Sequence, residues 1–399
     1  MLTHRAAWAM MEPRHWIASP AVTLEGNRIV SVAGGSRART QGPVVDHGPG
    51  VILPILVNAH THLSLSALRG RLPWDRGFVP WVQALMKERA ALSEAQALGA
   101  CGKAVEEMTR RGVGAVGEFG PHVAVEKALG PSPLAARVWL EFFGDARRLP
   151  PLPGDTQGIS WAYAAHAPHT VSPGGLCRIR EQDRRSGRPF CLHLAESREE
   201  VLFLEQGGGP WAEFLASLGL DFSAWGLPVG SPVAYAHRLR LLDSNTLAVH
   251  LTQAGEEDLD LLAGTGTRVC VCPRSNWNLH RRLPPLEEMV RRGLEPALGT
   301  DSLASVHTLD LFDEMGFVAE QFPGLSPDTI LAMVTLWGAR ALHLPGRGTL
   351  IPGSRAGLIF VGLEARNPSE AALRLVYGEF ERVIRLEAPS IGKEETRGL

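Results

Sequence analysis

The chain has 399 residues, of which 45% are hydrophobic and 21% charged, and its formal net charge is −2. This composition is typical of a globular protein with a sizeable core, and it gives no electrostatic basis for binding nucleic acid or an anionic membrane. We expect a cytoplasmic protein for three reasons. The five cysteines lack the spacing of a disulfide framework, and no secretory-type apolar segment lies near Met1. No apolar run reaches the roughly 20 residues that a membrane helix needs.

The predicted elements begin and end with short β-strands. Residues 21–32, AVTLEGNRIVSV, read as two alternating runs joined by a turn, and strand-like runs return after residue 350. We therefore expect residues 1–52 and 350–399 to form one small β-sandwich domain.

Between these ends, short apolar runs alternate with amphipathic segments. The runs cover residues 51–60, 112–120, 134–144, 159–168, 189–197, 246–253, 268–276 and 294–302. Eight strand–helix alternations over about 250 residues predict an α/β fold, a (β/α)₈ TIM-like barrel, at residues 53–349. A doubly wound open sheet is the alternative, but no glycine-rich phosphate loop follows the first run.

Polar side chains gather where the apolar runs end. His60 and His62 close the first run and point to the same face, because strand side chains alternate. The fourth, fifth, sixth and eighth runs end in His166, in His193 and Glu196, in His250 and in Asp301. The carboxyl ends of barrel strands share one rim, and imidazole and carboxylate groups bind divalent metals. The pattern predicts a metal site, whereas His60 and His62 alone could equally be exposed turn residues.

The motifs VNAHTHLSLS, HAPHTVSP, HLAESREE, VHLTQAG, CPRSN and LGTDSLAS together resemble the amidohydrolase superfamily. Within it, they are most similar to the branch that holds nucleoside and nucleobase deaminases and triazine hydrolases. The resemblance implies one divalent metal per chain, zinc or alternatively iron, bound by His60, His62, His193 and Asp301. Binuclear relatives bridge two metals with a lysine on the fourth strand, and none of the four lysines lies near residues 159–168, so we expect a single metal.

The same resemblance implies roles for the remaining residues at the rim. Glu196 would protonate a ring nitrogen of the substrate, and His250 would hold the attacking hydroxide in line. Asp301 would accept the proton of the water and pass it to the leaving amine. His166, Trp81 and Glu141 would contact the substrate. From the residues alone, Glu196 could instead favour a helix N-terminus and His250 could be a packed core histidine.

The sequence differs from the resembling deaminases at positions that bear on the choice of substrate. Val79 and Pro80 precede Trp81 where methylthioadenosine and S-adenosylhomocysteine deaminases carry an acidic residue, and Glu141 stands where they carry arginine. The motifs GFVPWV, EFFG and AESREEVLFLEQGGGP are more similar to the aminofutalosine deaminase group.

We therefore expect a deaminase of an adenine nucleoside derivative, aminofutalosine-like or methylthioadenosine/adenosine-like. The alternatives are a hydrolase of a triazine-like heterocycle, a guanine or cytosine deaminase and a metal-free assembly protein. The expected partners are a small-molecule substrate and a second copy of the chain, without nucleic acid or membrane.

Other residues keep open roles. The segment His280, Arg281 and Arg282 replaces a glycine-containing turn, and its arginines could meet a substrate carboxylate or be solvated. His122, His169 and His307 could line the pocket. We expect His237 to be structural, and Cys270 and Cys272 to be packed thiols rather than a second metal site.

Overall fold

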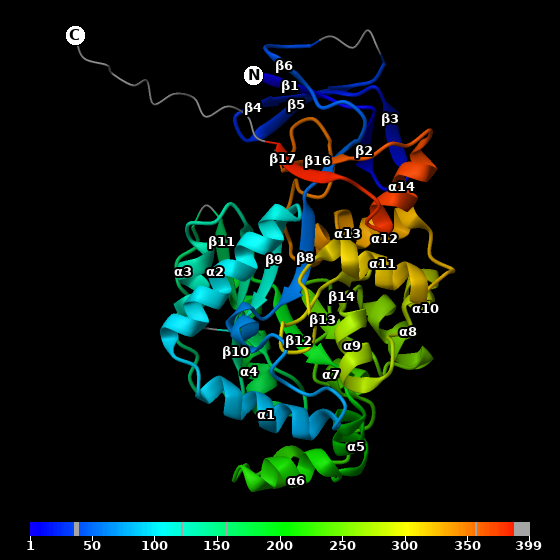
Figure 1. Ribbon diagram of the computed structural model, residues 1–399. Coiled ribbons are helices and arrows are strands. Elements are labelled where there is room, and N and C mark those ends of the chain that lie inside the picture. Colours follow the sequence, from blue (N-terminus) through cyan, green and yellow to red (C-terminus); the bar gives the residue numbers. More distant parts are fainter. Residues whose placement is uncertain (36–39, 121–122, 157, 356, 387–399) are drawn as a thin grey trace, which may run out of the picture.

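The computed structural model describes residues 1–35, 40–120, 123–156, 158–355 and 357–386 (Figure 1). Within these ranges no helix is both long and apolar enough to cross a membrane.

Eight parallel strands form the barrel. In chain order they are β8 (Leu56–Thr61), β9 (Val113–Phe119), β10 (Ala135–Phe142), β11 (Ile159–Ala165), β12 (Phe190–Leu194), β13 (Thr246–His250), β14 (Arg268–Val271) and β15 (Ala297–Leu298). Each pairs with its neighbours in sequence, and a parallel bridge between Thr61 and Asp301 brings the last strand back to the first. The predicted (β/α)₈ barrel is confirmed.

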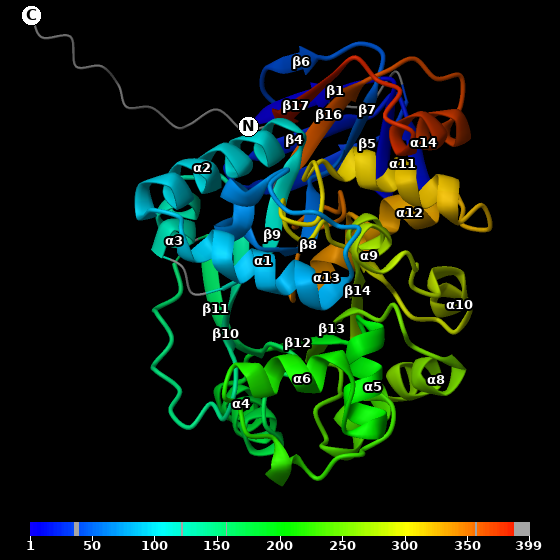
Figure 2. The same ribbon diagram turned by 60° about the horizontal axis from the view of Figure 1, so that its bottom comes forward.

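Helices lie around these strands, and α14 packs on α11 and α12 (Figure 2). They are η1 (Leu63–Leu68), α1 (Phe78–Ala90), α2 (Glu94–Arg110), α3 (Val123–Leu129), α4 (Pro173–Ser186), α5 (Arg198–Gln206), α6 (Pro210–Ser217), η2 (Ser223–Trp225), α7 (Pro232–Arg238), α8 (Glu256–Thr265), α9 (Pro273–His280), α10 (Leu286–Arg291), α11 (Leu311–Gln321), α12 (Pro327–Met333), α13 (Leu336–Ala341) and α14 (Pro368–Val376). Serine side chains cap several of them: Ser172 begins α4 and Ser197 begins α5, each accepting a hydrogen bond from a backbone nitrogen of the first turn.

Segments from both ends of the chain build two further sheets (Figure 1). One has the order β5-β4-β1-β6, from β1 (Leu2–Arg5), β4 (Ala21–Glu25), β5 (Arg28–Ala33) and β6 (Val44–Asp46). The other has the order β17-β16-β7-β2-β3, from β2 (Trp8–Glu12), β3 (His15–Ala18), β7 (Val51–Pro54), β16 (Leu358–Gly362) and β17 (Arg382–Leu386). Leu24, Ile52 and Phe360 belong to their shared apolar core, so the expected β-structure from the two ends is confirmed.

The run at residues 51–60, predicted as one barrel strand, is two strands in different sheets. β7 pairs with β2 and β16, whereas β8 pairs with β9 in the barrel. Ile55 separates them, and its backbone nitrogen donates to the carbonyl of Gly357. Both strands are fully buried, so apolar patterning alone could not reveal the change of sheet.

Candidate metal and catalytic site

His60 and His62 lie where β8 meets β15. His60 is fully buried, and its carbonyl oxygen accepts a hydrogen bond from the backbone nitrogen of Asp301 over 3.0 Å. This close approach depends on Gly299, where a Cβ atom would lie only 2.6 Å from the Cβ of His60. The chain therefore places the Asp301 carboxylate directly beside the histidines of the first strand.

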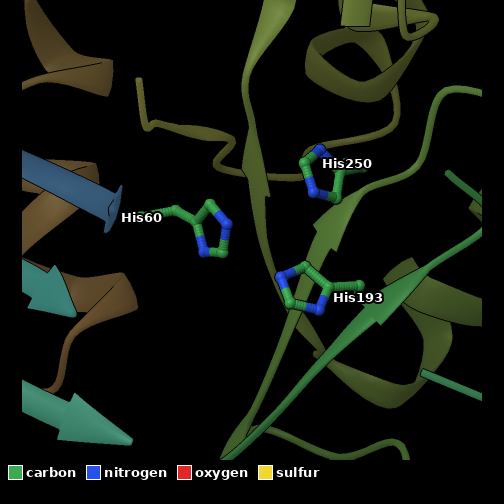
Figure 3. A group of neighbouring side chains, drawn as sticks. All are labelled: His60, His193 and His250. Atoms are coloured by element: carbon green, nitrogen blue, oxygen red, sulfur yellow. The ribbon is translucent and has the colours of Figure 1, made fainter. Parts of the chain in front are cut away.

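Three imidazole rings, from β8 and from the adjacent strands β12 and β13, face one another (Figure 3). The ring centroid of His60 lies 5.0 Å from that of His193 and 5.4 Å from that of His250, and the centroids of His193 and His250 are 5.3 Å apart. One nitrogen of each ring lies within 4.8 Å of the others, as do ligand atoms of His60, His62 and Asp301. We call His60, His62, His193 and Asp301 the His/Asp cluster.

His60 carries the clearest indication that the cluster needs a cation. Neither of its ring nitrogens has a hydrogen-bond partner among the described residues, although both are buried, and its Nε2 lies 3.6 Å from Asp301 Oδ1. A buried imidazole without partners is costly, and a metal ion would satisfy it. The donor set fits a divalent metal.

Neighbouring groups orient the ligand atoms of the cluster. His193 Nδ1 donates to the carbonyl of His166 over 2.9 Å, because a carbonyl only accepts, and this leaves the Nε2 lone pair free. Asp301 Oδ2 accepts from the hydroxyls of Ser275 at 2.6 Å and Ser305 at 2.9 Å. Asp301 Oδ1 remains, 3.6 Å from Nε2 of His62.

His250 has the opposite arrangement. Asn276 Nδ2 lies 3.1 Å from His250 Nδ1, and in this orientation of the amide Nδ1 accepts, while Asn276 Oδ1 has no hydrogen-bond partner among the described residues. Neutral His250 therefore carries its hydrogen on Nε2, which faces Glu196 Oε1 at 3.8 Å. This arrangement suits a hydrogen-bond donor better than a metal ligand.

Burial sets the protonation of the cluster. Burial lowers the pKa of His60 and of His193, and it lowers the pKa of His62 to about 3. These imidazoles are therefore neutral. Burial alone would raise the pKa of Asp301, but His60 and His62 hold it below the ordinary value. Neutral imidazoles beside one carboxylate are the protonation states in which these groups bind metal.

Glu196 follows β12 and is nearly buried. Its Oε1 lies 3.3 Å from His280 Nε2, and the backbone before it is left-handed at Ala195, with φ at 52°. Burial acts to raise the pKa of Glu196, but His250 and His280 outweigh it and lower this pKa to about 2.

Of the three residues expected to contact substrate, His166 and Glu141 lie beside His193. His166 hydrogen bonds to Thr170, and its ring lies 4.9 Å from that of His193. Glu141 Oε1 lies 3.6 Å from His193 Nδ1, and burial raises the pKa of Glu141 to about 8. Trp81 is buried, its Nε1 lies 3.4 Å from the carbonyl oxygen of Ala304, and its ring stacks on that of Phe78 at 5.9 Å.

Several residues that hold this site together have no role predicted from the sequence. They are Glu118, Glu200, Ser275, Asn276 and Ser305. Glu118 was detectable as the one charged residue in the apolar run at 112–120, and it accepts hydrogen bonds from the Thr61 hydroxyl and the Leu63 backbone on either side of His62. Ser275 and Asn276 belong to the motif CPRSN and Ser305 to LGTDSLAS, but neither motif indicated their partners, which they meet only in the folded chain.

The residues with open roles are placed as follows. His280 touches Glu196, His169 is buried with its Nδ1 3.7 Å from Glu200, and the His307 ring packs against Trp74. Arg281 and Arg282 are exposed, and Arg282 Nε donates to the carbonyl of Thr252. His237 lies in α7, Cys270 and Cys272 are buried, and His122 lies outside the described residues.

The amidohydrolase family model matches residues 51–385. The 5-methylthioadenosine/S-adenosylhomocysteine deaminase of Nitratidesulfovibrio vulgaris (strain DP4) is 32% identical over 409 residues, covering 94% of this chain and 87% of the relative. The aminodeoxyfutalosine deaminase of Deinococcus radiodurans is 29% identical over 352 residues, covering 80% of this chain and 81% of the relative.

Solved structures agree on the fold. An adenosine deaminase from Xanthomonas campestris with bound zinc has a TM-score of 0.77 at 28% identity, covering 94% of this chain and 88% of that one. The Helicobacter pylori aminofutalosine deaminase in complex with methylthio-coformycin has a TM-score of 0.85 at 23% identity, covering 96% and 97%.

Proposed function

The chain belongs to the amidohydrolase family and is a hydrolase that acts on carbon–nitrogen bonds, and from this premise we propose that it deaminates an adenine nucleoside derivative. The observation that carries the proposal is the convergence of the His/Asp cluster with Glu196 and His250 at one rim of the barrel. This arrangement combines a metal site, a carboxyl group and a hydrogen-bond donor around one reacting centre.

We assign one divalent metal to His60, His62, His193 and Asp301, with zinc as the native ion and iron as the alternative. The zinc-bound adenosine deaminase relative supports this choice. His250 is left out because its Nδ1 accepts from Asn276 and its Nε2 carries the hydrogen. A bound metal would lower the pKa of a coordinated water to about 7, which would supply hydroxide at neutral pH.

The residues of the chain supply the remaining chemistry. Glu196 gives a proton to the ring nitrogen next to the amine-bearing carbon, which makes that carbon more electrophilic. Asp301, held by two serine hydroxyls, takes a proton from the attacking water and gives it to the leaving amine. His250 donates from Nε2 to the attacking oxygen. The products are the oxo form of the heterocycle and ammonia.

The proposed substrate is an adenine nucleoside with an extended 5′ substituent. Both curated relatives are named as deaminases, one of methylthioadenosine and S-adenosylhomocysteine and the other of aminodeoxyfutalosine. Val79 and Pro80, in place of an acidic residue before Trp81, favour an aminofutalosine-like compound.

Ammonia release from zinc-reconstituted protein tests the proposal. The panel contains adenosine, methylthioadenosine, S-adenosylhomocysteine, aminofutalosine, guanine, cytosine and an aminotriazine. We expect turnover of at least one adenine nucleoside, with aminofutalosine the best. If protein with one metal per chain released no ammonia from any nucleoside, the proposed deaminase function would be contradicted. Chloride release from a chlorotriazine would then identify the alternative reaction.

A further inference from the structure

His280 is the last residue of α9 and contacts Glu196. Its Nε2 lies 3.3 Å from Glu196 Oε1, and its side chain is only 4% exposed. The Phe78 ring packs against the imidazole, with centroids 4.9 Å apart. The imidazole is therefore held in place against the Glu196 carboxylate.

The same imidazole also reaches a cavity that Glu196 does not line. This cavity has a volume of about 280 Å³, and its walls include His280, Phe78, Gln253 and the exposed residues Asp75, Arg198 and Arg281. Exposed walls connect it to solvent. His280 therefore lies between the cavity and the buried carboxylate.

The charge state of Glu196 requires such a source. Burial acts to raise the pKa of this carboxyl, but His250 and His280 lower it to about 2, so Glu196 is ionised at neutral pH and cannot by itself donate a proton. His250 is the poorer reservoir, because it is buried and does not line this cavity. Of the two histidines that flank Glu196 Oε1, His280 can hold the additional proton.

We propose that His280 is a positioning residue that supplies Glu196 with the proton it gives to the substrate ring, and that it is recharged from the adjoining cavity. The inference rests on the proposed deaminase function. An N–H bond of the His280 imidazolium breaks as an O–H bond forms on Glu196, and that O–H bond breaks as the ring N–H bond forms. Of the two protons of the attacking water, one leaves with ammonia and the other returns to solvent, which balances the proton that His280 takes up.

Other charged groups face this pair and must be kept constant in the test. His250 on β13 and Asp301 act on Glu196. The groups around the cavity at His280 are Asp75, Arg198, Glu199 and Arg281. All of them are present in every variant below.

The test measures kcat and KM of His280→Ala and His280→Gln against pH, with and without added imidazole. We expect His280→Ala to lose about 10²-fold in kcat, the low end of a general-acid contribution, with KM nearly unchanged. Glutamine restores a hydrogen bond but no transferable proton, so His280→Gln should stay slow. Imidazole should raise the kcat of His280→Ala in proportion to its protonated fraction, so that the gain fades as pH rises.

Controls separate this result from general effects of imidazole. His237→Ala removes an exposed histidine in α7 and should neither lose activity nor respond to imidazole. The double variant Glu196→Gln/His280→Ala should not be rescued, because the rescue acts through the carboxylate. Full activity in His280→Gln, or no imidazole effect on His280→Ala, overturns the inference while wild-type turnover leaves the deaminase function standing. Absence of ammonia release by wild-type protein overturns the function itself.

Discussion

The backbone nitrogen of Glu196 donates a hydrogen bond to Oε2 of Glu200 over 2.7 Å. The other oxygen, Oε1, accepts from the backbone nitrogen of Ala195 at 3.1 Å. Glu200 is fully buried in the first turn of α5, and Ser197 caps that turn. One carboxylate therefore fixes the left-handed bend at Ala195 that presents Glu196 to the site.

Replacing Glu200 by glutamine should misplace Glu196. The amide nitrogen of glutamine cannot accept, so one of the two backbone donors loses its partner. A displacement of about 1 Å at a reacting group can cost about 10²-fold, and we expect a kcat loss of 10- to 100-fold at this scale with the metal content unchanged. Steady-state kinetics with metal analysis of the same sample measures both. Glu205→Gln, at an exposed position on the same helix, is the matched control, and equal rates in the two variants would contradict the role of Glu200.

Alanine at His60 and at His250 should separate metal binding from catalysis. His60→Ala removes a member of the His/Asp cluster, so the purified protein should contain little zinc. His250→Ala should keep one zinc per chain and lose turnover, because His250 Nε2 carries hydrogen and not a free lone pair. Metal analysis after gel filtration gives the answer. Loss of zinc from His250→Ala to the level of His60→Ala would place His250 among the ligands instead.

The two serine hydroxyls that donate to Asp301 should raise the affinity of the site for the metal. Ser275→Ala and Ser305→Ala each remove one of two hydrogen bonds to Oδ2, and outer partners of this kind are worth about 10- to 100-fold in metal affinity or activity. Competition with a zinc chelator measures the affinity of each variant. Ser302→Ala changes a buried serine in the same segment without a hydrogen bond to Asp301 and should bind zinc as the wild type does.

Much of the fold and of the candidate site could be predicted from sequence because both depend on local order. Strand runs ending in His60, His193, His250 and Asp301 had to meet at one rim once the barrel was recognised. The residues that support them could not be found this way. Glu200 looks like an ordinary N-terminal helix residue, and the partners of Ser275 lie 26 and 30 positions away. Hydrophobic patterning was also blind to the switch between β7 and β8, since both are equally buried.

The last prediction concerns a carboxyl group remote from the reaction. Asp183 on α4 is fully buried, and its Oδ1 accepts from the backbone nitrogen of Tyr163 over 3.2 Å. Burial raises the pKa of Asp183 to about 8, against the opposing effects of the Tyr163 hydrogen bond, Arg180 and Arg188. In the unfolded chain this pKa is about 3.9. The folded protein therefore keeps a proton that the unfolded chain releases, and the stability that this proton contributes is fully present below about pH 4 and is lost by about pH 8.

Asp183→Asn should remove this loss, because asparagine keeps the acceptor for Tyr163 and never ionises. We expect the variant to gain free energy of unfolding relative to wild type as pH rises, by several kcal/mol at most, since one pKa unit corresponds to about 1.4 kcal/mol. Denaturant unfolding at pH 5, 7 and 9 measures the difference between the two proteins, so that effects common to both cancel. Glu181→Gln, at an exposed position on the same helix, should differ from wild type by under about 1 kcal/mol at every pH. A difference between Asp183→Asn and wild type that stays constant from pH 5 to 9 would mean that Asp183 is ionised in the folded protein and that its charge is compensated within the core.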